Sequence, residues 1–249
     1  MNRAQKEKLA HFRAITGAGD KAAAECLKQL NWALEPAIDH FYTCGKYSSA
    51  PSIDNRAIET LYKSYKDRDE DAITAEGIMK FCADLKVEPA DVVMLVIACY
   101  MNAAYMGEFT KDEFISGMVK LGCDSMDKLR NKLPELRAEL KSPSRFKDIY
   151  NYAYTFSREK GQKCVQLDTA LGMWQLLFPA DRPWPLLDDW CEFLTKQHGG
   201  KAISKDTWTQ LLDFIRTVKP DLSNFDPDNS AWPYLIDEFV EAVRAKRSA

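Results

Sequence analysis

Apolar residues recur at helical spacing along the whole chain, and the strict alternation expected of strands is nearly absent. The spacing is clearest near the C-terminus, where one stripe reads Trp208, Leu211, Leu212 and Ile215. A second stripe reads Trp232, Leu235, Ile236, Phe239, Val240 and Val243. Ser230 is the N-cap predicted for this second helix, and Pro233 falls in its first turn, where proline is tolerated. The sequence therefore predicts an all-α protein.

The first fifty residues have the pattern of a separate module. Periodicity predicts three short helices, over residues 6–15, 21–30 and 35–42. The segment Ser48-Ser49-Ala50-Pro51-Ser52 then has the composition of a linker, because short polar residues and proline bury nothing and break helices. The predicted division is a small three-helix domain, a linker and a larger helical domain, over residues 1–46, 47–55 and 56–249.

Composition is typical of a soluble intracellular protein. No apolar run approaches the roughly 20 residues of a membrane span, and the chain opens with a polar helix rather than a signal peptide. The seven cysteines show no Cys-x-x-Cys spacing, so we interpret them as reduced thiols. We therefore expect a cytoplasmic and nuclear monomer that holds no cofactor or metal.

The C-terminal part of the chain is strongly acidic. Between Ser204 and Val243 there are eight acidic and three basic residues, a net charge of −5, whereas the whole chain carries −3. Such a surface repels nucleic acid and anionic lipid but speeds the encounter with a basic protein. Two interpretations follow: a solvated helix face without a partner, or a docking surface for a basic protein.

Several stretches of the chain follow an order of residues that is typical of one family. Besides the acidic C-terminal segment, they are Tyr65-Lys66-Asp67, Gly77-Ile78, Phe81-Cys82, Gly107 to Phe114, Leu121 to Ser125, and Arg145 to Asp148. Over nearly its whole length the chain resembles the defective-in-cullin-neddylation (DCN-like) proteins. The resemblance implies a ubiquitin-associated (UBA)-like domain and then a potentiating-neddylation (PONY, or DCUN) domain, built on EF-hand-like helix pairs without calcium.

The resemblance implies that the acidic end binds the basic winged-helix domain at the C-terminus of a cullin. The implied cullin-binding residues are Asp206, Ala231 and Asp237. Their chemistry suits this role, because the two carboxylates can accept charge-assisted hydrogen bonds from lysine or arginine. The small Ala231 lets a partner approach closely.

A dense apolar set occupies the central helices, and most of it is expected to be core. The resemblance implies that part of this set lines a pocket for the acetylated N-terminal methionine of the neddylation conjugating enzyme. The implied residues are Ile78, Met94, Leu95, Ile97, Ala98, Gly107, Phe109, Phe156, Met173 and Leu176. Acetylation suits such a pocket, because burying an ammonium group there costs on the order of several kcal/mol. Thr110 and Glu113 have capping-box spacing, which predicts the start of the next helix.

The N-terminal module resembles a UBA domain in its spacing of small and aliphatic residues. A weak apolar patch for ubiquitin would consist of Ile15, Gly17, Phe41 and Tyr42. Phe41 has a second interpretation, in which it only closes the small core. The alternative function for the chain is therefore a ubiquitin-binding adaptor that acts through this module.

The segment from Asp67 to Ile73 carries acids in the manner of a calcium-binding EF-hand loop. A working loop needs glycine at position six and a bidentate glutamate at position twelve. Counted from Asp67, these positions hold Ala72 and Ile78. We therefore expect no calcium site in this segment.

No catalytic constellation stands out in the sequence. The three histidines have no near cysteine or carboxylate in a catalytic order, and no phosphate-binding glycine loop occurs. Cys123 is the strongest candidate for a nucleophile, but no adjacent basic residue is present to lower its pKa, so we interpret it as structural. The predicted function is that of a non-catalytic, scaffold-type co-ligase that promotes cullin neddylation.

Overall fold

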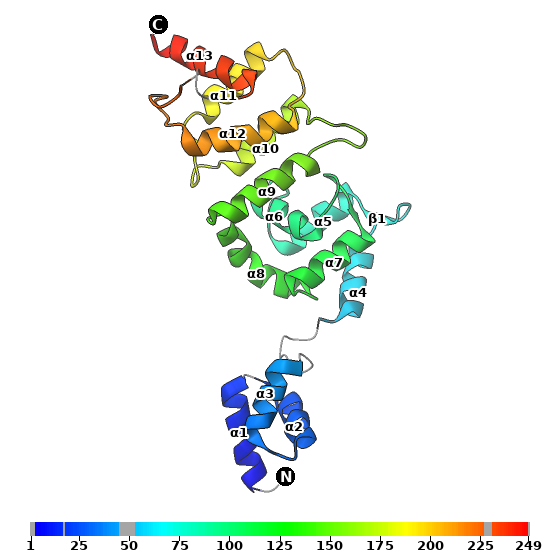
Figure 1. The fold of residues 1–249 in the computed structure, drawn as a ribbon. Helices are drawn as coiled ribbons and strands as arrows, with labels where there is room; N and C mark the ends of the chain where they lie inside the picture. Colours follow the sequence, from blue (N-terminus) through cyan, green and yellow to red (C-terminus); the bar gives the residue numbers. More distant parts are fainter. Residues whose placement is uncertain (1–2, 17, 45–52, 227–230, 249) are drawn as a thin grey trace. The chain divides into compact units, whose positions relative to one another are not determined.

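The structure is a computed structural model that describes residues 3–16, 18–44, 53–226 and 231–248. The chain divides into two compact units, Met1–Ile53 and Asp54–Ala249 (Figure 1). The described residues are helical apart from turns, one short ribbon and an isolated bridge, which confirms the all-α prediction. None of the described helices combines the length and the apolar character that crossing a bilayer requires. Residues 47–52 of the predicted linker lie outside the described residues.

The first unit is a bundle of the three predicted short helices, α1 (Arg3–Thr16), α2 (Asp20–Gln29) and α3 (Leu34–Cys44). Its buried core mixes two rings with small and aliphatic side chains, namely Phe12, Ala18, Ala23, Cys26, Leu27, Ala37 and Phe41. Small residues let such short helices approach closely. The rings of Phe12 and Phe41 meet edge to face, with centroids 5.5 Å apart, and close the core.

The second unit begins with two helix–loop–helix pairs. The first pair is α4 (Asn55–Tyr65) and α5 (Ala75–Leu85), and the second is α6 (Val92–Met101) and α7 (Lys111–Leu121). An antiparallel ribbon joins the two loops, with β1 (Ala72–Ile73) against β2 (Phe109–Thr110). The predicted capping box of Thr110 and Glu113 is confirmed at the start of α7. α6 is apolar on all sides, so it lies at the centre and packs against α7 and the two helices that follow.

Six further helices complete the second unit: α8 (Met126–Glu139), α9 (Pro143–Phe156), α10 (Leu167–Leu177), α11 (Leu187–Gln197), α12 (Lys205–Thr217) and α13 (Tyr234–Ser248). Aromatic rings hold α9, α10 and α12 together. Trp174 stacks on Trp208 with ring centroids 4.9 Å apart, and its Nε1 donates a hydrogen bond to the Tyr150 hydroxyl (3.0 Å). That hydroxyl donates in turn to the Trp208 carbonyl (2.9 Å), so the buried polar atoms of this cluster are satisfied.

The two C-terminal stripes are only partly as predicted. In α12, Trp208, Leu211 and Leu212 are buried as expected, whereas Ile215 is half-buried and Phe214 takes its place in the core. α13 begins at Tyr234, so Trp232 and Pro233 precede the helix and do not form its first turn; the N-cap predicted at Ser230 lies outside the described residues. The last four members of the second stripe, Ile236, Phe239, Val240 and Val243, are buried.

Candidate partner-binding sites

An apolar cavity of about 280 Å³ opens between α5, α6, β2, α9 and α10. Nine of the ten residues predicted for the conjugating-enzyme pocket line it: Ile78, Met94, Leu95, Ala98, Gly107, Phe109, Phe156, Met173 and Leu176. The tenth, Ile97, is fully buried and is not among the lining residues. Side chains from four helices and β2 thus converge on one apolar space, and their assignment to the conjugating enzyme stays a prediction.

Four methionines contribute to the lining of this cavity. Met79 and Met106 join the predicted Met94 and Met173 in its lining. Met79 is 63 % exposed and Met106 is 45 % exposed, so both form the rim. A thioether side chain is flexible and polarisable, and it adapts to the shape of an apolar ligand. Sequence analysis missed the two rim residues because a methionine beside the core pattern carries no signal of exposure.

Asp91 is the charged residue in the cavity lining, and its charge is already neutralised. Its carboxylate forms an ion pair with Arg137 and accepts a hydrogen bond from the Val93 N–H (2.9 Å), as the N-cap of α6. Burial works against ionisation, but these donors hold the pKa of Asp91 below its usual value. The cavity therefore offers no free counter-ion to an ammonium group.

Gly107 shapes the mouth of the cavity. Its φ of +88° lies in the region that favours glycine, and a Cβ at this position would meet no atom within 4 Å. The preceding Met106 N–H donates to the Phe156 carbonyl (3.1 Å), which ties this loop to α9. The backbone conformation, rather than a lack of space, therefore selects glycine at this position.

The three residues predicted to bind a cullin lie at the starts of α12 and α13. Asp206 is exposed in the first turn of α12, and Ala231 is exposed just before α13. Asp237 is half-buried, and its Oδ1 atom has no hydrogen-bond partner among the described residues. Burial and the nearby Glu241 raise the pKa of Asp237. Among the described residues, this oxygen is therefore available to accept a hydrogen bond from a partner.

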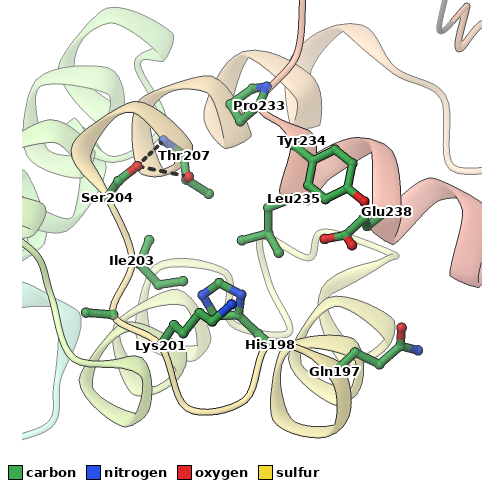
Figure 2. Close-up of a pocket in the computed structure, with 11 residues that line it drawn as sticks. Gln197, His198, Lys201, Ile203, Ser204, Thr207, Pro233, Tyr234, Leu235 and Glu238 are labelled. Carbon is green, nitrogen blue, oxygen red and sulfur yellow. Dashed lines mark hydrogen bonds between the residues drawn. The ribbon is translucent and has the colours of Figure 1, made fainter.

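A cleft of about 440 Å³ opens beside these residues, between the end of α11 and the starts of α12 and α13 (Figure 2). Its lining comprises Gln197, His198, Lys201, Ala202, Ile203, Ser204, Thr207, Pro233, Tyr234, Leu235 and Glu238. Glu238 is the acidic residue in this lining; Asp206 and Asp237 are not part of it, although each is adjacent in sequence to a lining residue. The sequence does not reveal the cleft, because its walls come from three separate segments.

Two family models and several known proteins match this chain. Residues 128–242 match the family model described as cullin binding, and residues 6–45 match a UBA-like domain. DCN1-like protein 4 of Drosophila melanogaster is 44 % identical over 188 residues, 75 % of this chain and 74 % of that protein. The human DCN1-like protein 5 is 43 % identical over 180 residues, 72 % of this chain and 74 % of that protein. The chain belongs to the DCN1-like family.

The cleft of this DCN1-like chain lies within the segment that matches the cullin-binding family model. All the cleft residues and the three predicted cullin-binding residues fall within 128–242. The apolar cavity differs, because α5, α6 and β2 precede the matched segment and only α9 and α10 belong to it. The cavity therefore joins the matched segment to the helix pairs before it.

In the UBA-like unit the structure brings only part of the predicted ubiquitin patch together. Ile15 and Tyr42 are 48 % and 63 % exposed, and the Tyr42 hydroxyl donates to the Ile15 carbonyl (3.2 Å). Phe41 is buried in the core beside Phe12, as in the second interpretation of this residue. Gly17 lies outside the described residues. An exposed aliphatic and aromatic pair remains at this end of the bundle.

The ribbon of this DCN1-like fold corrects the count of loop positions in the EF-hand-like segment. The second loop has glycine at position six and glutamate at position twelve when Asn102 is position one, which makes Phe109 position eight. Because Ile73 pairs with Phe109, position one of the first loop is Lys66 rather than Asp67. The acidic residue that begins a calcium loop is therefore replaced by a base.

The ammonium group of Lys66 lies among oxygens of its own loop. Its Nζ donates to the carbonyls of Asp67 (3.2 Å) and Glu70 (2.8 Å) and lies 3.7 Å from Asp71 Oδ1. At position twelve the residue is Gly77, where a Cβ would lie 2.1 Å from the Tyr65 carbonyl oxygen. The close contact leaves no room for the bidentate glutamate, and the loop carries its own cation.

Cys123 has the surroundings of a structural thiol. It is 2 % exposed, and its Sγ contacts the Leu121 carbonyl (3.4 Å). Burial raises the pKa of Cys123, which disfavours the reactive thiolate. No group of three metal-ligating side chains occurs in the part of the chain that the structure describes.

Proposed function

We propose that this protein promotes cullin neddylation as a non-catalytic co-ligase that holds two partners at once. The observation that carries the proposal is the presence, in the single unit Asp54–Ala249, of two surfaces with opposite chemistry. One is an apolar cavity without a free charge, and the other is an acidic surface at the starts of α12 and α13, where a cleft opens. Membership of the DCN1-like family and the cullin-binding match support a role in cullin neddylation.

The acidic surface is the proposed site for the winged-helix domain of a cullin. Asp206 and Asp237 accept hydrogen bonds from lysine or arginine of the partner, and Ala231 leaves room for the partner's backbone. The unpaired Oδ1 of Asp237 supports this role, because a buried carboxylate without a partner is unfavourable until a cation reaches it.

The apolar cavity is the proposed site for the acetylated N-terminal methionine of the conjugating enzyme. Its walls match a thioether side chain, and the only carboxylate in the lining is held by Arg137. An unacetylated amine would therefore be buried without a counter-ion, at a cost on the order of several kcal/mol. The site therefore favours an acetylated, uncharged N-terminus over a charged one.

The mechanism is positional. The two surfaces belong to one compact unit, so a bound cullin and a bound conjugating enzyme are restricted in their relative orientation. Holding two reactants in a productive geometry can lower a barrier by roughly 7 to 11 kcal/mol in the best cases. The covalent chemistry remains with the conjugating enzyme and its ring-finger ligase.

Calorimetry tests both sites separately. We expect a cullin winged-helix domain to bind the wild-type protein and not the Asp237→Lys variant. An acetylated methionine-initiated peptide should bind both proteins equally, and the same peptide without acetylation should bind neither. Absence of cullin binding to the wild-type protein would refute the proposed function.

The exposed pair of Ile15 and Tyr42 favours a second candidate function, ubiquitin binding by the first unit. Calorimetry of residues 1–53 with ubiquitin tests it, with Tyr42→Ala as the variant expected to lose binding. If the wild-type unit does not bind ubiquitin, this candidate fails without consequence for the cullin site.

A further inference from the structure

We propose that the cleft between α11, α12 and α13 receives one uncharged aliphatic or aromatic side chain from the basic surface of the cullin. The proposal rests on the proposed function and adds a source of specificity that charge alone does not provide. The site would then recognise an apolar anchor flanked by bases, rather than positive charge in general.

The walls of the cleft support an apolar occupant. Ile203, before α12, and Leu235, at the start of α13, point into the same space (Figure 2). Pro233 and Ala202 add further apolar surface. The volume of about 440 Å³ accommodates a large side chain. Leu235 is half-buried although it belongs to the apolar stripe of α13, so part of this leucine remains available to a partner.

The floor of the cleft is held in place before any partner binds. Ile203 exchanges two backbone hydrogen bonds with Val165 (2.7 and 3.1 Å), and its carbonyl also accepts one from the Tyr154 hydroxyl (3.1 Å). The Ser204 hydroxyl accepts a hydrogen bond from the Thr207 N–H (3.1 Å), which fixes the start of α12. A preformed pocket loses little conformational entropy on binding.

The acidic segment around the cleft supports a basic partner. Glu238 is in the lining, Asp206 and Asp237 are adjacent in sequence to lining residues, and Asp237 Oδ1 has no partner among the described residues. An apolar side chain in the cleft excludes water, and exclusion of water strengthens the surrounding pairs between carboxylates and bases. An apolar centre with a charged rim is the usual arrangement of a binding hot spot.

Lys201 distinguishes an apolar occupant from a carboxylate of the partner. It also lines the cleft, and no ion pair involves it among the described residues. If the partner placed a carboxylate in the cleft, Lys201 would pair with it and its removal would weaken binding. With an apolar occupant, removal of Lys201 takes one positive charge away from a surface that meets a basic partner, so binding is unchanged or tighter.

The test is calorimetry of a cullin winged-helix domain with the full-length protein and four variants. Leu235→Ala should lower the affinity about tenfold to thirtyfold, by a similar factor at low and high salt. Leu235→Met preserves the volume and should retain binding. Lys201→Ala should bind at least as tightly as wild type. Val119→Ala removes an exposed apolar side chain on α7 and should have no effect.

Each outcome separates the inference from the proposed function. Thermal unfolding of every variant shows that the folded state is kept, and Leu235→Met provides a second check at the same position. If Leu235→Ala binds like wild type while Asp237→Lys does not bind, the apolar anchor is refuted and the cullin site stands. Weaker binding by Lys201→Ala also refutes it, in favour of a partner carboxylate. If the wild-type protein does not bind, the proposed function itself fails.

Discussion

At the scale of single residues, Asp237 places function and stability in opposition. Burial raises its pKa, so the folded state binds a proton at this carboxylate more readily than the unfolded chain does. The stabilising contribution of this group is present below the unfolded pKa of about 3.9 and is lost as pH rises through the folded value. At neutral pH the ionised carboxylate therefore destabilises the free protein.

We expect Asp237→Asn to lose cullin affinity by about thirtyfold or more and yet to raise the melting temperature at pH 7. The gain in melting temperature should disappear near pH 3, where Asp237 of the wild-type protein is protonated in both states. Scanning calorimetry at the two pH values measures it. A variant that melts below wild type at pH 7 would show that Asp237 has a stabilising partner in the free protein.

Gly77 is a second residue with a testable role, because lack of space requires glycine at this position. A Cβ at Gly77 would lie 2.1 Å from the Tyr65 carbonyl oxygen, which is backbone and cannot move aside. We expect Gly77→Ala to destabilise the protein by about 2 to 4 kcal/mol, measured by denaturant unfolding. The matched control is Gly172→Ala in α10, where a Cβ meets nothing within 4 Å and should stabilise by about 0.5 to 1 kcal/mol. Equal effects of the two substitutions would contradict this account.

At the scale of elements, most helices follow from periodicity and capping. The three short N-terminal helices and the capping box at Thr110 were predictable because these signals are local. The start of α13 was not, because tertiary packing decides whether Trp232 and Pro233 join a helix. The position count in the EF-hand-like loop depended on the pairing of Ile73 with Phe109, a contact between residues far apart in sequence.

The loop between α4 and α5 gives a prediction for a whole element. Lys66→Met removes the ammonium from the loop oxygens and should lower the melting temperature by about 2 to 4 °C for each kcal/mol lost. Lys63→Met, on the exposed side of α4, should leave it unchanged. Calcium or a chelator should not shift the melting temperature of the wild-type protein. A rise on calcium addition would mean that the loop binds the ion.

At the scale of the whole molecule, the two partner sites should respond differently to salt. The cavity holds no free charge, whereas the proposed cullin site lies in the acidic segment between Ser204 and Val243. Raising the salt concentration from 50 to 500 mM should weaken cullin binding about tenfold or more, because the ion pairs are screened. Binding of the acetylated peptide should change about twofold or less. A parallel loss of both affinities would contradict the division into an apolar and an electrostatic site.

The division of the chain into two units also has a functional consequence. A protein that lacks residues 1–53 keeps both proposed sites, since they lie in Asp54–Ala249. It should stimulate cullin neddylation in a purified system as well as the full chain does. Loss of stimulation would move the working part to the UBA-like unit. The sites themselves were predictable only where family resemblance named residues, because the cleft joins side chains from 197 to 238 that no local pattern connects.

The contact of Lys66 with its loop has a further consequence for how the protein senses its surroundings. A calcium loop is filled or empty according to the concentration of the ion, which makes its helix pair a reporter of cellular signals. Here the cation is the ammonium group of Lys66, which is part of the chain, so its presence in the loop does not depend on the concentration of any ion. Unlike a bound ion, this amine cannot dissociate from the protein. We therefore expect this helix pair not to respond to changes in calcium concentration.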